Sequence, residues 1–465
     1  MVQRKGLVWA AACAALACAG IVRAESAPAV AGDGLASRPV MLDAAATVPA
    51  TVPDTTPASA PASAPATTPA TPPTPLMGLL ETCGIAKPIE DAKITISGFV
   101  EGGYTVSASK PPGDLILGRF QDTKDNSIVL DQFDIAVDRP VDYGAAATNH
   151  TWDIGGHAEF VYGWDAGLFH SSGLLDNPAV PGVTNGTYRS RTSPENQADI
   201  LQAYLDFALP VGTGLRVRAG KFVTLLGYEG IGPTSNPFYS HSYLFSFAVP
   251  LTQTGIETEY ALNSDIKFDA GITRGWSQTF KDNNGEPDFL GNVTYTPQES
   301  DFLKKWKAVL ALSFGPQATH DNHDYWTVAD FQLTYQATGD GAAPGSLLYA
   351  LNADYGDAPH ALPTSSGQWY GAAGYVQYIA TTVFTINGRI EWYDDANGFT
   401  LGTGSATDVY EATLGLKITP FPDDNIGKNF ALRPEIRYDY SSKDFFNGGT
   451  KHQQATFGID AYFTF

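Results

Sequence analysis

Charged side chains recur at every second position in several segments of this 465-residue chain. In residues 429–440, NFALRPEIRYDY, apolar residues alternate with a second set that includes Arg433, Glu435, Arg437 and Asp439. Other segments place Arg216, Arg218, Glu257, Glu259, Arg389 and Glu391 in the same way. Opposed charges along a narrow aqueous passage set up a field that orients water and dipolar solutes. We therefore expect these residues to line a pore, with mutual neutralisation in ion pairs as the alternative.

Catalytic residue types are not brought together by the sequence. Most of the eight histidines fall in predicted loops or at strand ends, and only His157, two residues from Glu159, lies within a predicted strand face. No G-x-S-x-G motif is present. The stretches HDNHD at 320–324 and DNNGEPD at 282–288 contain metal-ligand types, but we interpret both as solvated acidic loops. We expect no catalytic residue, no metal, no cofactor and no enzyme activity.

The alternation that places these charges is the period of a β-strand. From Phe99 onward it recurs between clusters of Gly, Asp, Asn and Pro, and we count about sixteen strands between residues 93 and 465. The polar faces carry too much charge for a dry core without many partners. A wide barrel in a membrane solves this by turning its apolar face to lipid and its polar face to water. The predicted fold is all-β: a transmembrane antiparallel β-barrel of about 16 strands.

The connections sort into two classes that support this strand count. Short turns such as PVGTG, ALNSD and IATT fall on one side of the count, although the longer PFPDDNIGKN falls there too. Long connections fall on the other side, at 107–126, 165–197, 226–250, 276–288, 394–406 and 442–452. Single-chain barrels keep short turns in the periplasm and long loops outside, so this sorting favours a barrel.

The N-terminal part of the chain is different in composition. Residues 1–24 have a basic start, an apolar run and a small-x-small cleavage pattern, which predicts a signal peptide. Residues 25–83 are dominated by Ala, Pro and Thr, with a short helical turn expected in PLMGLLETCGIAKPIEDA, and are predicted to be a disordered spacer before the barrel at 84–465. Removal of the signal peptide leaves Cys83 as the one remaining cysteine. The net charge of the remaining chain is −24, which argues against a nucleic-acid partner.

The chain ends in ATFGIDAYFTF, where apolar residues stand at every second position up to Phe465. The apolar face of this terminal strand must be shielded from water. In a closed membrane barrel, contact with lipid shields it. We expect this strand to pair with the first one, KITISGFVEGGYTV, because an open sheet edge in hydrocarbon would leave backbone groups unpaired.

These features together resemble bacterial outer-membrane porins. Residues 94–465 resemble the OmpL-like β-barrel porin family through ISGFVEGGYTV, LDQFDIAVDRPV, LRVRAGKFVTLLGYE and NPFYSHSYLFSFAVPLTQTGIETEY. The resemblance implies an exported outer-membrane channel for passive diffusion of small hydrophilic solutes or ions. It also implies that Phe465 belongs to the signal read by the barrel-assembly machinery, and that outer-membrane lipid, lipopolysaccharide and a second copy of the chain are partners to consider.

By analogy with porins, the third external loop at 226–250 is expected to fold inward as a constriction. The loop is rich in aromatic residues for a segment exposed only to water. Its candidate constriction residues are Glu229, Phe238, Tyr239, His241 and Tyr243. For this loop the alternatives left open are an external plug and an interface with a neighbouring barrel. For the whole protein they are a substrate-specific channel, a surface adhesin or barrel enzyme, and a soluble exported β-sandwich.

Overall fold

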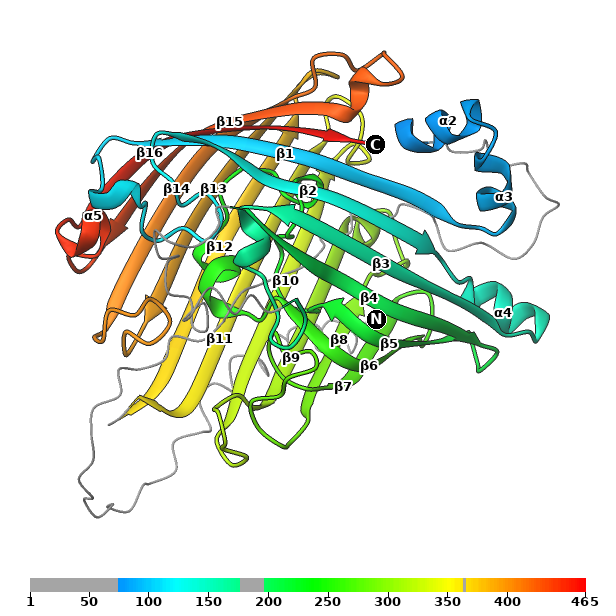
Figure 1. The fold of residues 1–465 in the computed structure, drawn as a ribbon, viewed down its shortest axis with the longest axis horizontal. Helices are drawn as coiled ribbons and strands as arrows, with labels where there is room; N and C mark the ends of the chain where they lie inside the picture. Colours follow the sequence, from blue (N-terminus) through cyan, green and yellow to red (C-terminus); the bar gives the residue numbers. More distant parts are fainter. Residues whose placement is uncertain (1–73, 176–195, 363–364) are drawn as a thin grey trace. The chain divides into compact units, whose positions relative to one another are not determined.

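The computed structural model describes residues 74–175, 196–362 and 365–465, so the predicted signal peptide and most of the predicted spacer lie outside the described residues. Within the described part, sixteen strands form one closed antiparallel barrel (Figure 1). The predicted strand number and fold class are confirmed. The strands are β1 Thr95–Ser107, β2 Ser127–Arg139, β3 Asp153–Gly163, β4 Gln197–Leu209, β5 Leu215–Val223, β6 Thr252–Ala261, β7 Ile266–Thr273, β8 Asp288–Tyr295, β9 Trp306–Pro316, β10 Tyr325–Thr338, β11 Leu347–Leu362, β12 Ser365–Ile379, β13 Phe384–Asp395, β14 Thr407–Ile418, β15 Phe430–Ser441 and β16 Gln453–Thr464.

The barrel closes where the first strand meets the last. Strand β1 pairs antiparallel with β16, in a register that sets Phe99 opposite Thr464 and Val106 opposite Phe457. The seam extends to Phe465, whose N–H donates to Gly98 O at 2.8 Å and whose oxygen accepts from Gly98 N–H at 2.9 Å. The pairing expected for the terminal strand is therefore present, and no strand edge remains in this ring.

Most strands have an apolar outer face and a largely polar inner face, as the alternation predicts, whereas β12 turns Trp369, Ala373 and Tyr375 inward. On β15, Ile436 and Tyr438 are 58% and 47% exposed, whereas the intervening Arg437 is 2% exposed. On β6, Ile256 is 56% exposed and its neighbour Glu257 is 1% exposed. The large exposed side chains of the barrel are apolar or aromatic, which is the surface that a hydrocarbon environment requires.

The two ends of the barrel differ in their connections. One end, here called the turn end, carries both chain ends of the barrel and the connections 140–152, 210–214, 262–265, 296–305, 339–346, 380–383 and 419–429. The other end, the loop end, carries the long connections 108–126, 224–251, 274–287, 396–406 and 442–452. The short turns and the described long connections predicted from the sequence lie at these two ends, although the turn end also has the longer connections 140–152 and 419–429, and most of the predicted connection 165–197 lies outside the described residues.

Short helical elements decorate the strands. The α-helices are α2 Pro75–Thr82, α3 Ala86–Asp91, α4 Tyr143–Asn149 and α5 Phe446–Gly449; single turns lie at Pro112–Asp114, Asp165–Gly167, Pro233–Ser235, Leu303–Lys305 and Gly427–Asn429, and a π-type turn at Leu244–Ala248. Helix α2 begins at Thr74, whose hydroxyl accepts from Met77 N–H, with Pro75 in the first turn. It forms where the sequence predicted a helical turn, in the last part of the predicted spacer.

Candidate functional site

The connection between β5 and β6, residues 224–251, lies inside the barrel and forms the centre of the candidate site. Its aromatic residues are buried: Phe238 is 1% exposed, Tyr239 4% and Tyr243 0%. The Tyr239 hydroxyl donates to Asp131 on β2 at 3.1 Å, and the Tyr243 hydroxyl donates to Asp439 on β15 at 3.0 Å. The loop therefore folds inward and contacts opposite sides of the seam, as expected for a constriction segment.

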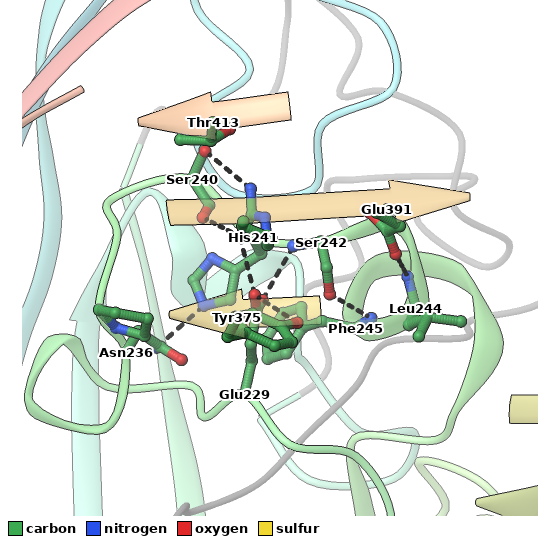
Figure 2. A network of polar contacts seen from close by, with 12 residues as sticks. Glu229, Asn236, Ser240, His241, Ser242, Leu244, Phe245, Tyr375, Glu391 and Thr413 are labelled. Atoms are coloured by element: carbon green, nitrogen blue, oxygen red, sulfur yellow. Dashed lines mark hydrogen bonds and ion pairs between the residues drawn. The ribbon is translucent and has the colours of Figure 1, made fainter. Parts of the chain in front are cut away.

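Carboxylates on the barrel wall bind the loop backbone directly. Glu435 on β15 accepts from the N–H groups of Tyr239 and Ser240 at 3.0 and 3.2 Å. Glu391 on β13 accepts from Tyr243 and Leu244 at 2.6 and 2.7 Å (Figure 2). A buried loop must find partners for its backbone donors, and here carboxylate oxygens of the wall accept from them.

Arg389 on β13 makes four hydrogen bonds that connect the loop to the barrel wall. Its guanidinium donates to Glu229 of the loop at 2.7 Å, to the Ser240 carbonyl at 2.8 Å and to Glu411 on β14 at 2.9 Å. Its side chain is 0% exposed. It therefore joins the loop to two strands and balances two buried carboxylates.

Arg433 and Arg437 on β15 act on the loop in the same way. Arg433 donates to the carbonyls of Pro233 and Asn236, both at 2.9 Å, and pairs with Glu101 on β1 and Asp460 on β16. Arg437 donates to the His241 carbonyl at 2.6 Å and pairs with Asp439 at 2.7 Å. Three arginines, which the sequence places at strand period, thus hold carbonyls of one loop.

Glu229 and His241 form the polar centre of the loop (Figure 2). The Glu229 carboxylate accepts from Arg389, from Ser242 N–H at 2.8 Å and from the Tyr375 hydroxyl at 3.0 Å. Burial by itself would raise the pKa of Glu229, but Arg389 and the hydrogen bonds outweigh it, and the pKa lies below its usual range. Glu229 is therefore ionised under ordinary conditions.

His241 is held neutral by its surroundings. Its Nε2 lies 2.9 Å from the Gly230 carbonyl and 3.1 Å from the Asn236 side-chain nitrogen, and its ring packs on Phe245 with centroids 3.9 Å apart. Burial lowers the pKa of His241 to about 4. Its Nδ1 has no hydrogen-bond partner among the described residues, so a second proton there would be unsatisfied.

Inward-facing apolar side chains cluster in the loop-end half of the barrel interior. Segments after β3, β7, β13 and β15 join loop 224–251 in one cluster with lumen-facing wall residues. The largest members are Phe169, Phe222, Phe238, Tyr243, Phe245, Trp276, Trp326, Trp369, Tyr393, Phe399, Phe445 and Phe446. Polar anchors place some of these rings, since the Trp369 indole donates to Ala248 O and the Trp276 indole to Ser313, both at 3.0 Å.

The wall formed by β3–β9 is more open in its turn-end half, and here called the open wall. Arg216 and Arg218 on β5 have side chains 17% and 14% exposed. Arg218 forms a two-point pair with Asp206 and lies 3.7 Å above the Tyr204 ring, while Arg216 pairs with Glu259 at 2.6 Å. The acids beneath are less exposed than the cations that cover them, since Glu257 is 1% and Glu259 6% exposed.

The structure thus separates the sequence-predicted site residues into two groups. The first group consists of residues that belong to loop 224–251 or contact it: Glu229, Phe238, Tyr239, His241, Tyr243, Arg389, Glu391, Arg433, Glu435, Arg437 and Asp439. The second group, on the open wall, is Arg216, Arg218, Glu257 and Glu259. Their lining of a conducting path stays a prediction.

Several residues of the site were not predicted. Arg119 in the connection 108–126 pairs with Asp122 at 2.9 Å and reaches Asp439 at 3.5 Å. Burial raises the pKa of Asp122 to about 6 although Arg119 opposes it. The polar faces of their strands include Glu101, Glu411 and Asp460, so the alternation of polar and apolar residues could have identified them. Arg119 lies in a loop, where no such alternation exists.

Within residues 74–175, 196–362 and 365–465, no cluster of His, Cys, Asp or Glu has an arrangement that could hold a metal ion. Over the same ranges no helix is long and apolar enough to cross a membrane.

Comparisons with known proteins agree with the architecture. Residues 93–465 match the family model described as "Putative beta-barrel porin-2, OmpL-like". Among curated proteins none matches the sequence. The high-pH structure of Pseudomonas putida OprB is similar with 12% identity and a TM-score of 0.51, over 83% of this chain and 97% of that one. The outer membrane channel DcaP of Acinetobacter baumannii has 12% identity and a TM-score of 0.48, over 80% and 97% of the two chains.

Proposed function

Because the chain belongs to the OmpL-like β-barrel porin family and is an outer-membrane channel for small solutes, we propose that its aqueous route passes along the open wall, β3–β9, opposite loop 224–251. The turn end then faces the periplasm and the loop end the outside. Members of this family are channels rather than enzymes.

The observation that carries the proposal is a difference in exposure at the same position along a strand. Arg218 is the fourth residue from the turn end of β5, and Arg433 is the fourth residue from the turn end of β15. The Arg218 side chain is 14% exposed and the Arg433 side chain 2%. Arg433 is buried because loop 224–251 covers it, through the carbonyls of Pro233 and Asn236.

The charges of the open wall give the route its chemistry. Arg216 and Arg218 stand in front of Glu257, Glu259 and Asp206, so a passing ion meets guanidinium groups before carboxylates. Lys307 on β9 adds a half-buried ammonium group that has no ion-pair partner among the described residues. Charged rings and patches of this kind set ion preference without binding one solute tightly.

The loop-bearing wall, β13–β16, has a different role in this proposal. The arginines and carboxylates of this wall form the hydrogen bonds and ion pairs that hold the loop. They therefore set the width of the route and do not contact solutes. The rings of the loop-end half narrow the route further toward the outside. Small hydrophilic solutes are then selected by size in the outer half and by charge in the inner half.

We also propose that Phe465 acts in assembly of the barrel. It completes the β1–β16 seam through its backbone, and its ring lies 6.2 Å from Phe133 and 6.5 Å from Phe463. Phe465→Ser should lower the amount of folded barrel in outer membranes, followed as heat-modifiable migration. Undiminished insertion would remove the terminal ring from this role.

The route is tested by ion selectivity in planar bilayers. In the variant Arg216→Glu with Arg218→Glu, the reversal potential in a salt gradient should shift toward cation preference. The matched control Lys304→Glu with Lys428→Glu changes the same number of charges on exposed turn-end residues, and should shift the reversal potential less. An unshifted reversal potential in a folded Arg216/Arg218 variant would contradict the proposed route.

A further inference from the structure

A groove crosses the outer, lipid-facing side of strands β11–β16 and β1. Its volume is about 990 Å³. Small outward-facing residues form its floor, and larger apolar and aromatic residues form its sides. The floor contains Gly374, Gly388, Ala412, Ala455 and Ala108, and the sides contain Val106, Tyr349, Val376, Ile390, Leu414, Ile436, Tyr438 and Phe457.

The register of the strands explains why the surface is hollow here. Gly374 stands opposite Ile390, and Ala412 stands opposite Tyr438. Ala455, in turn, stands opposite the other side of Tyr438. Each large side chain is thus flanked by a residue with little or no side chain, and the depression is continuous across neighbouring strands.

The groove runs obliquely across the wall. At one end, Ala455 is the third residue from the loop end of β16; at the other, Tyr349 is the third residue from the turn end of β11. It therefore extends over the part of the barrel that lies in hydrocarbon. If the groove were left empty, both the protein and the surrounding lipid would lose van der Waals contacts. A flexible acyl chain is the lipid component that can fill a groove of this shape.

Three lysines stand above the external end of the groove. Lys110 follows β1, and Lys443 and Lys451 lie in the connection between β15 and β16. All three are exposed and have no ion-pair partner among the residues that the structure describes. The connections 108–126 and 442–452 pack against each other. A Cβ atom placed on Gly448 would lie 2.8 Å from Pro112, and one placed on Gly118 would lie 3.2 Å from Phe445 and Phe446.

The three lysines outnumber Asp114 and Asp444, the exposed acids of the same two connections, and this excess of basic residues is unusual for the molecule. The chain has 28 basic against 49 acidic residues. On the loop-end connections of β7–β10 the exposed or half-exposed acids include Asp282, Glu286, Asp321 and Asp324. Basic residues beside one end of an apolar groove therefore complement a ligand with a negative head and hydrocarbon tails, and the acidic sector does not.

We propose that the groove and Lys110, Lys443 and Lys451 bind a phosphorylated glycolipid of the outer leaflet, with acyl chains in the groove and phosphates on the lysines. The wall behind the groove floor is the one that anchors loop 224–251, since Arg389 and Arg437 lie on the inner side of the same strands. Bound lipid would therefore stabilise the part of the barrel wall that holds loop 224–251.

The proposal is tested with diphosphorylated lipid A and the full-length protein purified in detergent, by native mass spectrometry over a lipid titration. Lys110→Glu with Lys451→Glu should weaken lipid A binding at least about tenfold, since each lysine near phosphate contributes about a factor of five to ten. Lys304→Glu with Lys428→Glu should leave it unchanged.

The apolar part of the site has its own variant pair. Ala412→Leu with Ala455→Leu fills the groove floor without loss of any polar contact, and should also weaken lipid A binding. Ala270→Leu with Ala308→Leu makes the same change on the lipid face of β7 and β9, and should not.

Three results would overturn the proposal. Equal binding of phosphatidylethanolamine or dephosphorylated lipid A would exclude recognition of the phosphates. Unchanged lipid A binding in the groove-filling variant would exclude the groove. Dissociation of an oligomer in that variant, with lipid binding retained, would identify the groove as an interface between copies of the chain.

Discussion

Arg218 and Arg433 are both arginines and both fourth from the turn end of their strands, on two sides of one barrel, and their surroundings differ. Arg218 pairs with one carboxylate, stacks on Tyr204 and remains partly open to water. Arg433 pairs with two carboxylates and two loop carbonyls and is nearly sealed from water. The strand alternation is identical in both places, so the loop and not the strand decides whether a lumen charge contacts solutes or holds structure.

This difference has an energetic consequence. A buried charge that loses its partner costs far more than a solvent-screened one, because water cannot replace the partner. The loop-bearing wall should therefore be sensitive to single substitutions in its stability, and the open wall mainly in its conduction.

The largest expected effect is loss of Arg389. In Arg389→Met, Glu229 and Glu411 lose their buried cation, and the free energy of unfolding should fall by about 3–5 kcal/mol. Arg218→Met on the open wall should cost less than Arg389→Met, since removal of the partly exposed guanidinium would leave Asp206 uncovered toward the water of the lumen. Denaturant unfolding in detergent measures both. Equal losses in the two variants would erase the distinction between the walls.

Acid pH should weaken the loop through His241. The folded pKa of about 4 lies below the usual value of about 6.5, so the unfolded chain binds this proton first as pH falls. The His241 contribution to stability is therefore lost between about pH 6.5 and about pH 4, by up to about 3 kcal/mol. Glu229, whose pKa is lowered, keeps its contribution until pH falls toward that lowered pKa.

The variant His241→Asn isolates this effect. The difference in unfolding free energy between wild type and variant should shrink steadily from pH 7 to pH 4. A difference that is independent of pH over this range would show that His241 is not the titrating group.

A smaller effect is expected at the carboxylates that cap the loop backbone. Glu435→Gln keeps an acceptor for Tyr239 and Ser240 N–H but removes the charge, and should cost about 1.5 kcal/mol. A loosened loop should also increase open-channel current noise. The control Glu257→Gln alters a carboxylate of the same type on the open wall, and quiet currents in Glu435→Gln would argue against loop fixation by this residue.

The smallest effect on stability is expected at Lys307. Because no described carboxylate pairs with it, Lys307→Gln should change the unfolding free energy by no more than about 0.5 kcal/mol. The reversal potential should still move toward cation preference, by less than in the Arg216/Arg218 variant. A large stability loss would reveal a structural partner for this ammonium group.

Much of this architecture follows from period-two alternation. The strand number, the inward direction of Arg433 and Glu391, and the β1–β16 seam all depend on local sequence and closure, and were predictable. The inward course of loop 224–251 followed from resemblance to porins and from its aromatic residues. What alternation cannot reveal is whether the space facing Arg433 holds water or a loop, because that depends on contacts between residues about 200 positions apart.

The central claim is that water reaches the open wall and not the wall behind loop 224–251. Two threonines face the lumen on the two sides: Thr294 on β8 is half-buried, and Thr413 on β14 is 4% exposed. In a Cys83→Ser background, Thr294→Cys should react rapidly with a charged, membrane-impermeant thiosulfonate in folded channels, detected as an added mass and a change of current, and Thr413→Cys should not. Equal reaction at both positions, or faster reaction at Thr413→Cys, would contradict the account.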